Sequence, residues 1–190
     1  MANRAKLRSM KQPPGSTART TILTATASLL DEGGEANAKL AQVAHRAKVT
    51  ARTVQRHFGG VRNVIDAAQA YRFDTSALAV GSGIVHALRA ADDEAAIRDA
   101  IDEALRAALA PEGVDARMRH ANVLSVTRHR PDLASHVAAT AKRERLDLED
   151  AIADAQRRRR IATKVDAAAA AILIRASLFG LLQRDLMPRL

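Results

Sequence analysis

The sequence of 190 residues has no cysteine and no tryptophan, and aromatic residues make up only 2% of it. The lack of cysteine excludes disulfide bonds, thiol nucleophiles and thiolate zinc sites. Apolar residues nevertheless make up 47% of the sequence. Because so few of them are aromatic, alanine supplies much of this class, which favours closely packed helices over a β-sandwich. The longest purely apolar run, residues 167–174, is far too short for a membrane span. Residues 1–17 lack the apolar segment of a secretory signal, so we expect a helical, cytoplasmic protein without a membrane partner.

Basic residues are concentrated in the first part of the chain. The net charge is +9, with 30 Lys and Arg against 21 Asp and Glu. Residues 1–73 hold 12 of these basic residues and only four of the acidic ones, whereas the remainder is almost balanced. Such an excess is typical of a surface that meets a polyanion, although a solvated basic face gives the same count.

The apolar spacing is helical along the whole chain, and turn signals divide it into segments. Residues 1–16 are polar and basic and contain Pro13-Pro14-Gly15, so we expect a disordered arm there. We predict one domain over residues 17–75 and a second over residues 76–190. The second domain is expected to contain four further helices, over residues 92–110, 115–129, 131–159 and 165–187.

The strongest motif lies in the first domain. A helix that ends at Gly33-Gly34 precedes two short helices, residues 38–47 and 51–58, which are separated by a three-residue turn. This is the pattern of a helix-turn-helix unit. In the last helix Val54 and Phe58 lie four residues apart and are expected to be buried, with Thr50 as the N-cap.

The opposite side of this last helix is polar and basic, with Arg52, Gln55 and Arg56 among its residues. Arg and Gln side chains can make two hydrogen bonds to guanine and adenine edges in the major groove. Taken alone, eight residues fit a solvated amphipathic helix equally well.

A longer string, from Ile22 to Val64, carries a family resemblance. It includes Leu29-Leu30-Asp31-Glu32-Gly33, Val43-Ala44, Ala47-Lys48-Val49-Thr50 and Thr53-Val54-Gln55-Arg56-His57-Phe58. This string resembles the DNA-binding domain of the TetR (tetracycline repressor) family of transcription regulators. The rest of the chain resembles that family only in length and helical character.

The resemblance implies an all-α fold with two parts. These are an N-terminal three-helix helix-turn-helix DNA-binding domain and a C-terminal helical bundle for dimerisation and effector binding. The expected function is that of a ligand-responsive repressor, which binds a palindromic double-stranded DNA operator as a homodimer. The family positions for DNA contacts hold Lys39, Thr50, Thr53, Gln55 and His57, and charge and helical face add Lys48, Arg52 and Arg56.

Four residues depart from the family pattern. Lys39 replaces a phosphate-contacting Thr, Gln55 replaces a Tyr, and Val61 replaces the Lys that usually opens the next helix. Lys48 replaces the turn glycine, which costs on the order of 1 kcal/mol if the position has a positive φ. The fold inference survives these changes, whereas the individual DNA contacts are less well defined.

The same resemblance implies a small-molecule effector of unknown class, bound between the middle helices. Candidate pocket residues are Leu88, Ile101, Leu105, Met118, Asn122, Ser125, Val126 and His129. It also implies a dimer interface on the last two long helices, whose small and apolar side chains recur at three- and four-residue steps. Candidate interface residues are Ala138, Ala141, Arg145, Leu148, Ile152, Ala169, Ile172, Leu173, Ala176, Phe179, Gly180 and Gln183.

No constellation of residues indicates catalysis. The six histidines have no compact metal-ligand spacing, and Gly81-Ser82-Gly83 lacks the other elements of a phosphate-binding loop. We therefore expect no enzymatic activity, no catalytic residue, no metal and no cofactor. Two other functions stay open, an architectural DNA-binding protein without ligand response and a helical protein-interaction module. The N-terminal arm either enters the minor groove or is simply disordered.

Overall fold

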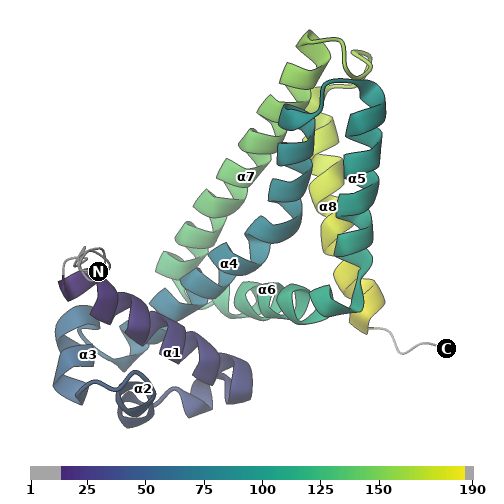
Figure 1. The fold of residues 1–190 in the computed structure, drawn as a ribbon. Coiled ribbons are helices and arrows are strands. Elements are labelled where there is room, and N and C mark those ends of the chain that lie inside the picture. The colour runs from purple at the N-terminus through teal and green to yellow at the C-terminus, as the bar shows by residue number, and fades with distance from the viewer. Residues whose placement is uncertain (1–13, 187–190) are drawn as a thin grey trace, which may run out of the picture. The chain divides into compact units, whose positions relative to one another are not determined.

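The computed structural model describes residues 14–186, apart from the side chains of 14–17, 77–80, 108, 182–184 and 186. The predicted arm therefore lies mostly outside the described residues. Every regular element within that range is helical, which confirms the all-α fold class (Figure 1). The chain divides into two compact units, Met1–Tyr71 and Arg72–Leu190. This division falls within α4 (Val61–Ala90), close to the boundary that the sequence predicts at residues 75–76.

Unit 1 contains α1 (Pro14–Asn37), α2 (Leu40–Arg46), α3 (Ala51–Phe58) and the start of α4. α1 begins at Pro14, earlier than predicted, and its helical geometry breaks at the expected glycine pair. Gly34 has a φ of 64°, a left-handed conformation that glycine adopts without the strain of a Cβ atom. The helices enclose a core that is aliphatic apart from the ring of Phe58. Its residues include Ile22, Leu29, Leu30, Val43, Val54, Phe58 and Val64.

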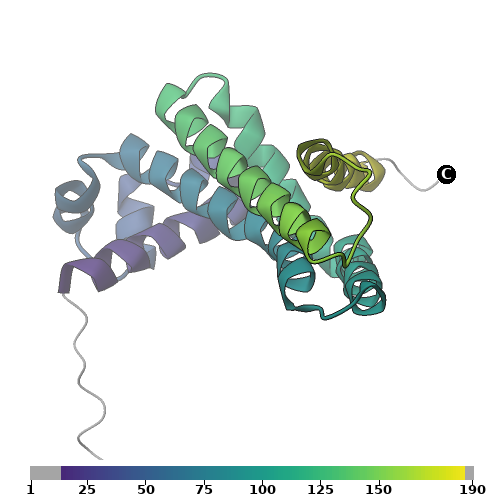
Figure 2. The same cartoon turned by 90° about the horizontal axis from the view of Figure 1, so that it is seen from above.

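Unit 2 consists of the rest of α4 and the helices that follow it. These are α5 (Glu94–Leu109), the 3₁₀ turn η1 (Pro111–Gly113), α6 (Val114–Thr127), α7 (Pro131–Arg157) and α8 (Ala167–Leu186). α7 and α8 run in opposite directions and are joined by a loop at one end of the unit, as Figures 1 and 2 show. The four helices predicted for this part of the sequence are confirmed to within a few residues at their ends.

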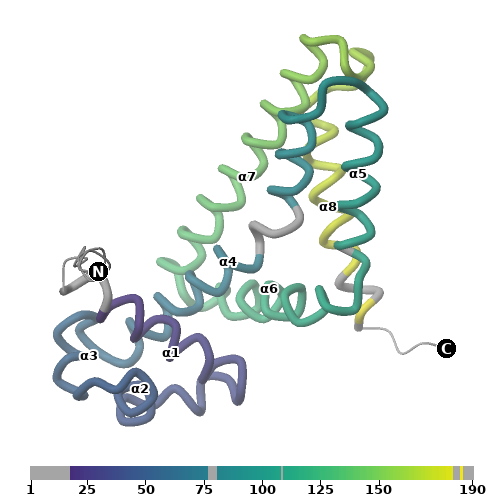
Figure 3. The backbone as a smooth tube through the Cα atoms, in the orientation of Figure 1, coloured from purple at the N-terminus to yellow at the C-terminus, as the bar shows by residue number. Residues whose placement is uncertain are grey.

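The core of unit 2 is aliphatic and rich in alanine. Ile84, Leu88 and Ile97 pack with Leu148 and Ile152 of α7. The neighbouring alanines at 151, 155 and 171 are also buried, and their small side chains allow α7 and α8 to approach closely. The traces of α4, α5, α7 and α8 are easiest to follow in Figure 3.

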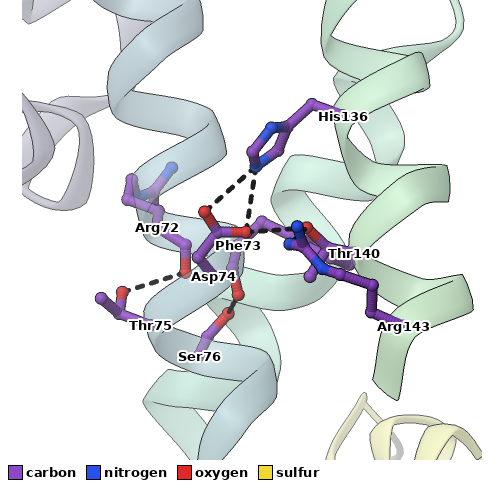
Figure 4. Close-up of polar contacts among 8 residues, drawn as sticks. All are labelled: Arg72, Phe73, Asp74, Thr75, Ser76, His136, Thr140 and Arg143. Atoms are coloured by element: carbon purple, nitrogen blue, oxygen red, sulfur yellow. Dashed lines mark hydrogen bonds and ion pairs between the residues drawn. The ribbon is translucent and has the colours of Figure 1, made fainter. Parts of the chain in front are cut away.

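A polar cluster joins α4 to α7 (Figure 4). The Asp74 carboxylate lies 3.0 and 3.1 Å from Nε2 of His136 and accepts a hydrogen bond of 3.1 Å from the hydroxyl of Thr140. Arg143 donates to the same hydroxyl oxygen at 2.9 Å. The first turns of α4 within unit 2 are therefore attached to α7 by polar contacts.

Candidate nucleic-acid interface and effector cavity

The turn between α2 and α3 reverses the chain in three residues. Lys48, which stands where the TetR family has the turn glycine, has a positive φ of 53°. Its backbone N–H donates to the carbonyl of His45 at 3.1 Å, and the next residue, Val49, donates to Ala44 at 3.0 Å. Because both bonds hold the turn, a lysine occupies a conformation that costs on the order of 1 kcal/mol in a residue with a Cβ atom.

Local contacts fix the orientation of α3. The hydroxyl of Thr50 accepts from the backbone N–H of Thr53 at 3.1 Å, so Thr50 is the N-cap as predicted. Val54 and Phe58 are buried, as the sequence predicts, and Gly59 ends the helix in a left-handed conformation. Since one face is held in the core, the opposite face of α3 is turned to solvent.

The eight residues predicted to contact DNA lie on α3, in the turn before it and at the start of α2. Thr53 and His57 are half-buried, and the other six are exposed: Lys39, Lys48, Thr50, Arg52, Gln55 and Arg56. α3 itself carries no acidic residue. In addition, the guanidinium of Arg19, on α1, lies 4.8 Å from the centre of the Phe58 ring, a cation–π contact that the sequence alone did not indicate.

Arg46 has a structural role in the same unit. Its guanidinium donates to both carboxylate oxygens of Glu32 at 2.6 and 2.7 Å and to the hydroxyl of Ser28 at 3.0 Å. The bonds from Arg46 and Ser28 lower the pKa of Glu32 to about 2 and raise the pKa of Arg46. Arg46 therefore links α2 to α1, and its charge is already balanced.

Unit 2 contains a cavity of about 1160 Å³, comparable to the largest sites for drug-sized ligands. Most of its wall is apolar, and α4 to α8 all contribute. Its apolar residues include Phe73, Val85, Leu124, Val137, Leu178, Phe179 and Leu181, and its polar residues include His86, Arg89, Glu103, Arg117, His120, Glu144, Asp147 and Arg175.

Among the residues of this wall, His120 has a clearly shifted pKa. Its ring stacks on Phe73 with centroids 4.5 Å apart. Burial, followed by the positive charge of Arg175, lowers the pKa of His120 below its ordinary value. Arg175 in turn donates to Glu144 at 2.8 Å, which joins α8 to α7. The sequence predicts burial of Phe73 but none of these contacts, because they join residues that are far apart in the chain.

None of the predicted effector residues lines this cavity, and their role in effector binding stays a prediction. On α6 the bordering face is Arg117, His120 and Leu124, and Leu88 is instead buried in the core of unit 2. The periodicity of α6 is compatible with either face pointing inward, and the face that borders this cavity is not the one chosen from the sequence. The eight residues outside the lining are Leu88, Ile101, Leu105, Met118, Asn122, Ser125, Val126 and His129.

The predicted interface residues are exposed on α8 but mostly half-buried or buried on α7. On α8 those with described side chains are all exposed: Ala169, Ile172, Leu173, Ala176, Phe179 and Gly180. The exposed fractions of Ile172, Leu173 and Phe179 are 55%, 67% and 54%. The side chain of Gln183 lies outside the described residues.

On α7, by contrast, only Ala138 is exposed, and Ala141 and Arg145 are half-buried. Leu148 and Ile152 are 2% and 4% exposed because this face of α7 packs into the core of its own chain. Neither side chain is available to a partner, so both are removed from the expected interface.

The fold is similar to that of solved transcriptional regulators. A Rhodococcus sp. protein assigned to the TetR family is 22% identical, with a TM-score of 0.63 and 90% of each chain covered. The fatty acid degradation regulator FadR from Bacillus halodurans is 14% identical, with a TM-score of 0.62, 92% of this chain and 85% of that chain covered. The TetR family regulator PfmR from Thermus thermophilus is 16% identical, with a TM-score of 0.54 and 88% of each chain covered.

These likenesses define the class of fold as a helix-turn-helix unit followed by a helical bundle. More narrowly, the fold is that of TetR-type regulators, so the resemblance carried by residues 22–64 is confirmed at the level of fold. Neither a protein-family model nor a curated protein matches the sequence. Within residues 14–186, no helix has both the length and the hydropathy that crossing a bilayer requires.

Proposed function

We propose that this chain is a DNA-binding regulator of transcription of the TetR type. The observation that carries the proposal is the presentation of α3. Val54 and Phe58 hold one face in the core, Thr50 caps the first turn, and the exposed face offers Arg52, Gln55 and Arg56 without a neighbouring acid on the helix. An exposed helix of this kind, preceded by a tight turn, suits insertion into the major groove.

The proposed contacts divide into two groups. Arg52, Gln55 and Arg56 have the donors and acceptors that recognise base edges. The second group anchors the protein to the backbone through phosphates, which carry no sequence information. It consists of Lys39, Lys48, Thr50, Thr53 and His57.

The proposed regulator acts as a homodimer through α8. Ile172, Leu173 and Phe179 each expose more than half of their surface. Large apolar side chains that are grouped on one exposed face usually mark a site where another protein binds. Ala176 and Gly180 lie on the same face, and a Cβ atom built on Gly180 would meet no described atom within 4 Å. This face is therefore apolar, and Ala176 and Gly180 leave room on it for a second helix.

A ligand in the cavity of unit 2 would control DNA binding through a population shift. An effector that binds more tightly to one conformation favours that conformation. In the repressor mechanism this conformation sets the two recognition helices at a separation that no longer fits successive major grooves, about 34–36 Å apart. The sign of regulation follows from whether the effector weakens or strengthens DNA binding.

The test separates base readers from phosphate anchors. The full-length protein is titrated with the duplex that it selects from a random pool, and with versions that carry single base-pair changes. Gln55→Ala should lose discrimination at one base pair, worth about 1–3 kcal/mol, whereas Lys39→Ala should weaken binding to every duplex alike. Lys142→Ala, which removes an exposed lysine from unit 2, is the matched control and should bind as the unchanged protein does. A uniform loss for Gln55→Ala would contradict its proposed role.

A further inference from the structure

The connection between α7 and α8 is strongly basic. A run of four arginines, residues 157–160, ends α7 and begins the loop that leads to α8. Lys164 follows in the same loop, so residues 157–164, here called the basic loop, contain five cations and no acid. The basic loop lies at one end of unit 2, where α7 and α8 are joined (Figure 1). The proposed function gives these side chains no role.

The acids that flank the basic loop in the sequence balance only part of its charge. Asp154 accepts from Arg157 at 3.2 Å and from Arg158 at 2.9 Å. Asp166 accepts the backbone N–H of Ala169 at 2.7 Å, at the start of α8. No described residue forms an ion pair with the other three cations, which are Arg159, Arg160 and Lys164.

The connection between α4 and α5 lies at the same end of unit 2 and carries further acids (Figures 1 and 2). Glu94 is bound to Arg98 at 3.0 Å, and Asp93 caps α5 by accepting the backbone N–H of Ala96 at 2.8 Å. Asp92 is exposed. Among the residues that the structure describes, no ion pair joins any of these acids to the basic loop, so its three unpaired cations remain open to a partner.

Several contacts fix the conformation of the basic loop. The side-chain amide of Gln156 donates to the carbonyls of Ala162 at 3.1 Å and Val165 at 2.8 Å. Arg159 has a φ of 55°, a left-handed conformation that a side chain disfavours, and its backbone N–H donates to Gln156 at 2.9 Å. Nη1 of Arg160 is buried, with no hydrogen-bond partner in the described part of the chain. Because the backbone is held in this way, little conformational freedom is lost when the loop binds a partner.

Closely spaced arginines suit the phosphates of nucleic acid. The planar fork of a guanidinium donates two parallel hydrogen bonds to a phosphate. Duplex DNA carries one negative charge about every 1.7 Å along its axis, so several cations of one loop can be neutralised together. Contacts to the phosphate backbone carry no sequence information.

The remaining residues of the loop argue against a membrane partner. Protein segments that lie at a bilayer surface expose side chains such as Trp, Phe and Leu. The basic loop has no aromatic residue, and its Ile161 is half-buried against the core of unit 2. Val165, next to the loop, supplies a single exposed apolar side chain. Charge rather than apolar area therefore dominates this surface.

We infer that the basic loop is a second DNA-binding site, which holds the phosphate backbone of a duplex regardless of its sequence. Arg159, Arg160 and Lys164 supply the contacts, because no carboxylate balances their charges. The site belongs to unit 2, whereas α3 belongs to unit 1. When α3 occupies an operator, the basic loop binds a second segment of DNA, and this bridging rests on the proposed function.

The basic loop is tested in a full-length protein whose α3 cannot bind DNA. Arg52→Glu combined with Arg56→Glu places two acids on the exposed face of α3. This protein should still bind an unrelated duplex at about 50 mM salt, as fluorescence anisotropy measures. The further changes Arg159→Gln, Arg160→Gln and Lys164→Gln, together called the loop variant, should weaken that binding by about tenfold or more. They should also reduce the slope of log affinity against log salt by about 2.7, since each of three phosphates contributes about 0.9.

A matched control removes three exposed cations elsewhere in unit 2, by Arg98→Gln, Arg106→Gln and Lys142→Gln. It has the same net charge as the loop variant and should bind the duplex as the α3 variant does. Circular dichroism should show equal helix content in all of these proteins. No duplex binding by the α3 variant, or equal losses in the loop variant and the control, would overturn the inference. Tighter binding to phosphatidylglycerol vesicles or to polyglutamate than to the duplex would also overturn it, in favour of a membrane or an acidic protein.

Bridging is measured with proteins whose α3 is unchanged. Beads that carry the selected duplex are loaded with protein, and a fluorescent unrelated duplex is then added. The unchanged protein and the matched control should capture the second duplex, whereas the loop variant should occupy the beads equally well and capture none. Capture by the loop variant would contradict the second site.

The two proposals fail separately. A protein that selects no duplex through α3 contradicts the regulator, while the α3 variant still tests the basic loop. Conversely, sequence-specific binding that the loop variant shares in every assay would retain the regulator and refute the second DNA-binding site.

Discussion

Replacement of Lys48 by glycine should stabilise unit 1, although it removes a side chain. Lys48 has a φ of 53°, and hydrogen bonds on both sides of the turn prevent it from relaxing. Relief of the left-handed conformation is worth about 1–2 kcal/mol, while the greater freedom of glycine in the unfolded chain offsets about 0.4–1 kcal/mol. The net gain is therefore roughly 0.5–1 kcal/mol.

Lys48→Ala is the matched control because it removes the same charge but keeps the Cβ atom. Hydrogen exchange of the α2 and α3 amides, followed by mass spectrometry, reports the opening of unit 1 in the full chain. Exchange in Lys48→Gly should be roughly two- to fivefold slower than in Lys48→Ala. Both variants should bind duplex DNA equally weakly compared with the unchanged protein. The reasoning is refuted if the glycine variant exchanges as fast as the alanine variant, or faster.

Three other predictions follow from the described contacts. Thr50→Ala should destabilise α3 by about 1 kcal/mol in urea unfolding, while Thr50→Ser, which retains the capping oxygen, should not. Glu32 has a folded pKa of about 2 against an ordinary 4.5, so the stability it contributes is present above pH 4.5 and is lost as the pH falls towards 2. Urea midpoints at a series of acid pH values should show a smaller loss for Glu32→Gln. If the protein forms the proposed dimer through α8, Gly180→Arg should give a monomer with unchanged helix content, whereas Ala95→Arg on α5 should leave the dimer intact. Light scattering and circular dichroism measure both quantities, and a dimeric Gly180→Arg would place the interface elsewhere.

Local signals in the sequence were sufficient for the helix-turn-helix. Val54 and Phe58 lie four residues apart, so an amphipathic helix must bury both together. Thr50 precedes that helix and has a side chain that can cap it. The break in α1 likewise depends on a local feature, the left-handed conformation of Gly34, which glycine adopts without strain. Each of these features depends on residues only a few positions apart, so it can be predicted from a single sequence.

The cavity was not predictable in the same way. Its polar groups come from different helices, as Glu144 of α7 and Arg175 of α8 do. The spacing of residues along the sequence does not show which side chains of two helices lie close together. α6 has two mixed faces, and the choice between Met118 and Arg117 as an inward residue depends on how α7 and α8 pack against it. Burial of Leu148 in its own core was missed for the same reason.

Selection from a random pool of duplexes tests the central claim most directly. The full-length protein is mixed with the pool, the bound duplexes are amplified over several rounds, and the enriched sequences are aligned. A dimer that presents two α3 helices predicts an inverted repeat with half-sites about 10 base pairs apart, or a multiple of that distance. Arg52→Ala or Gln55→Ala should relax particular positions within each half-site. Enrichment of no motif, with binding that depends on salt alone, would identify an architectural DNA-binding protein, and failure to retain any duplex would contradict a role in DNA recognition altogether.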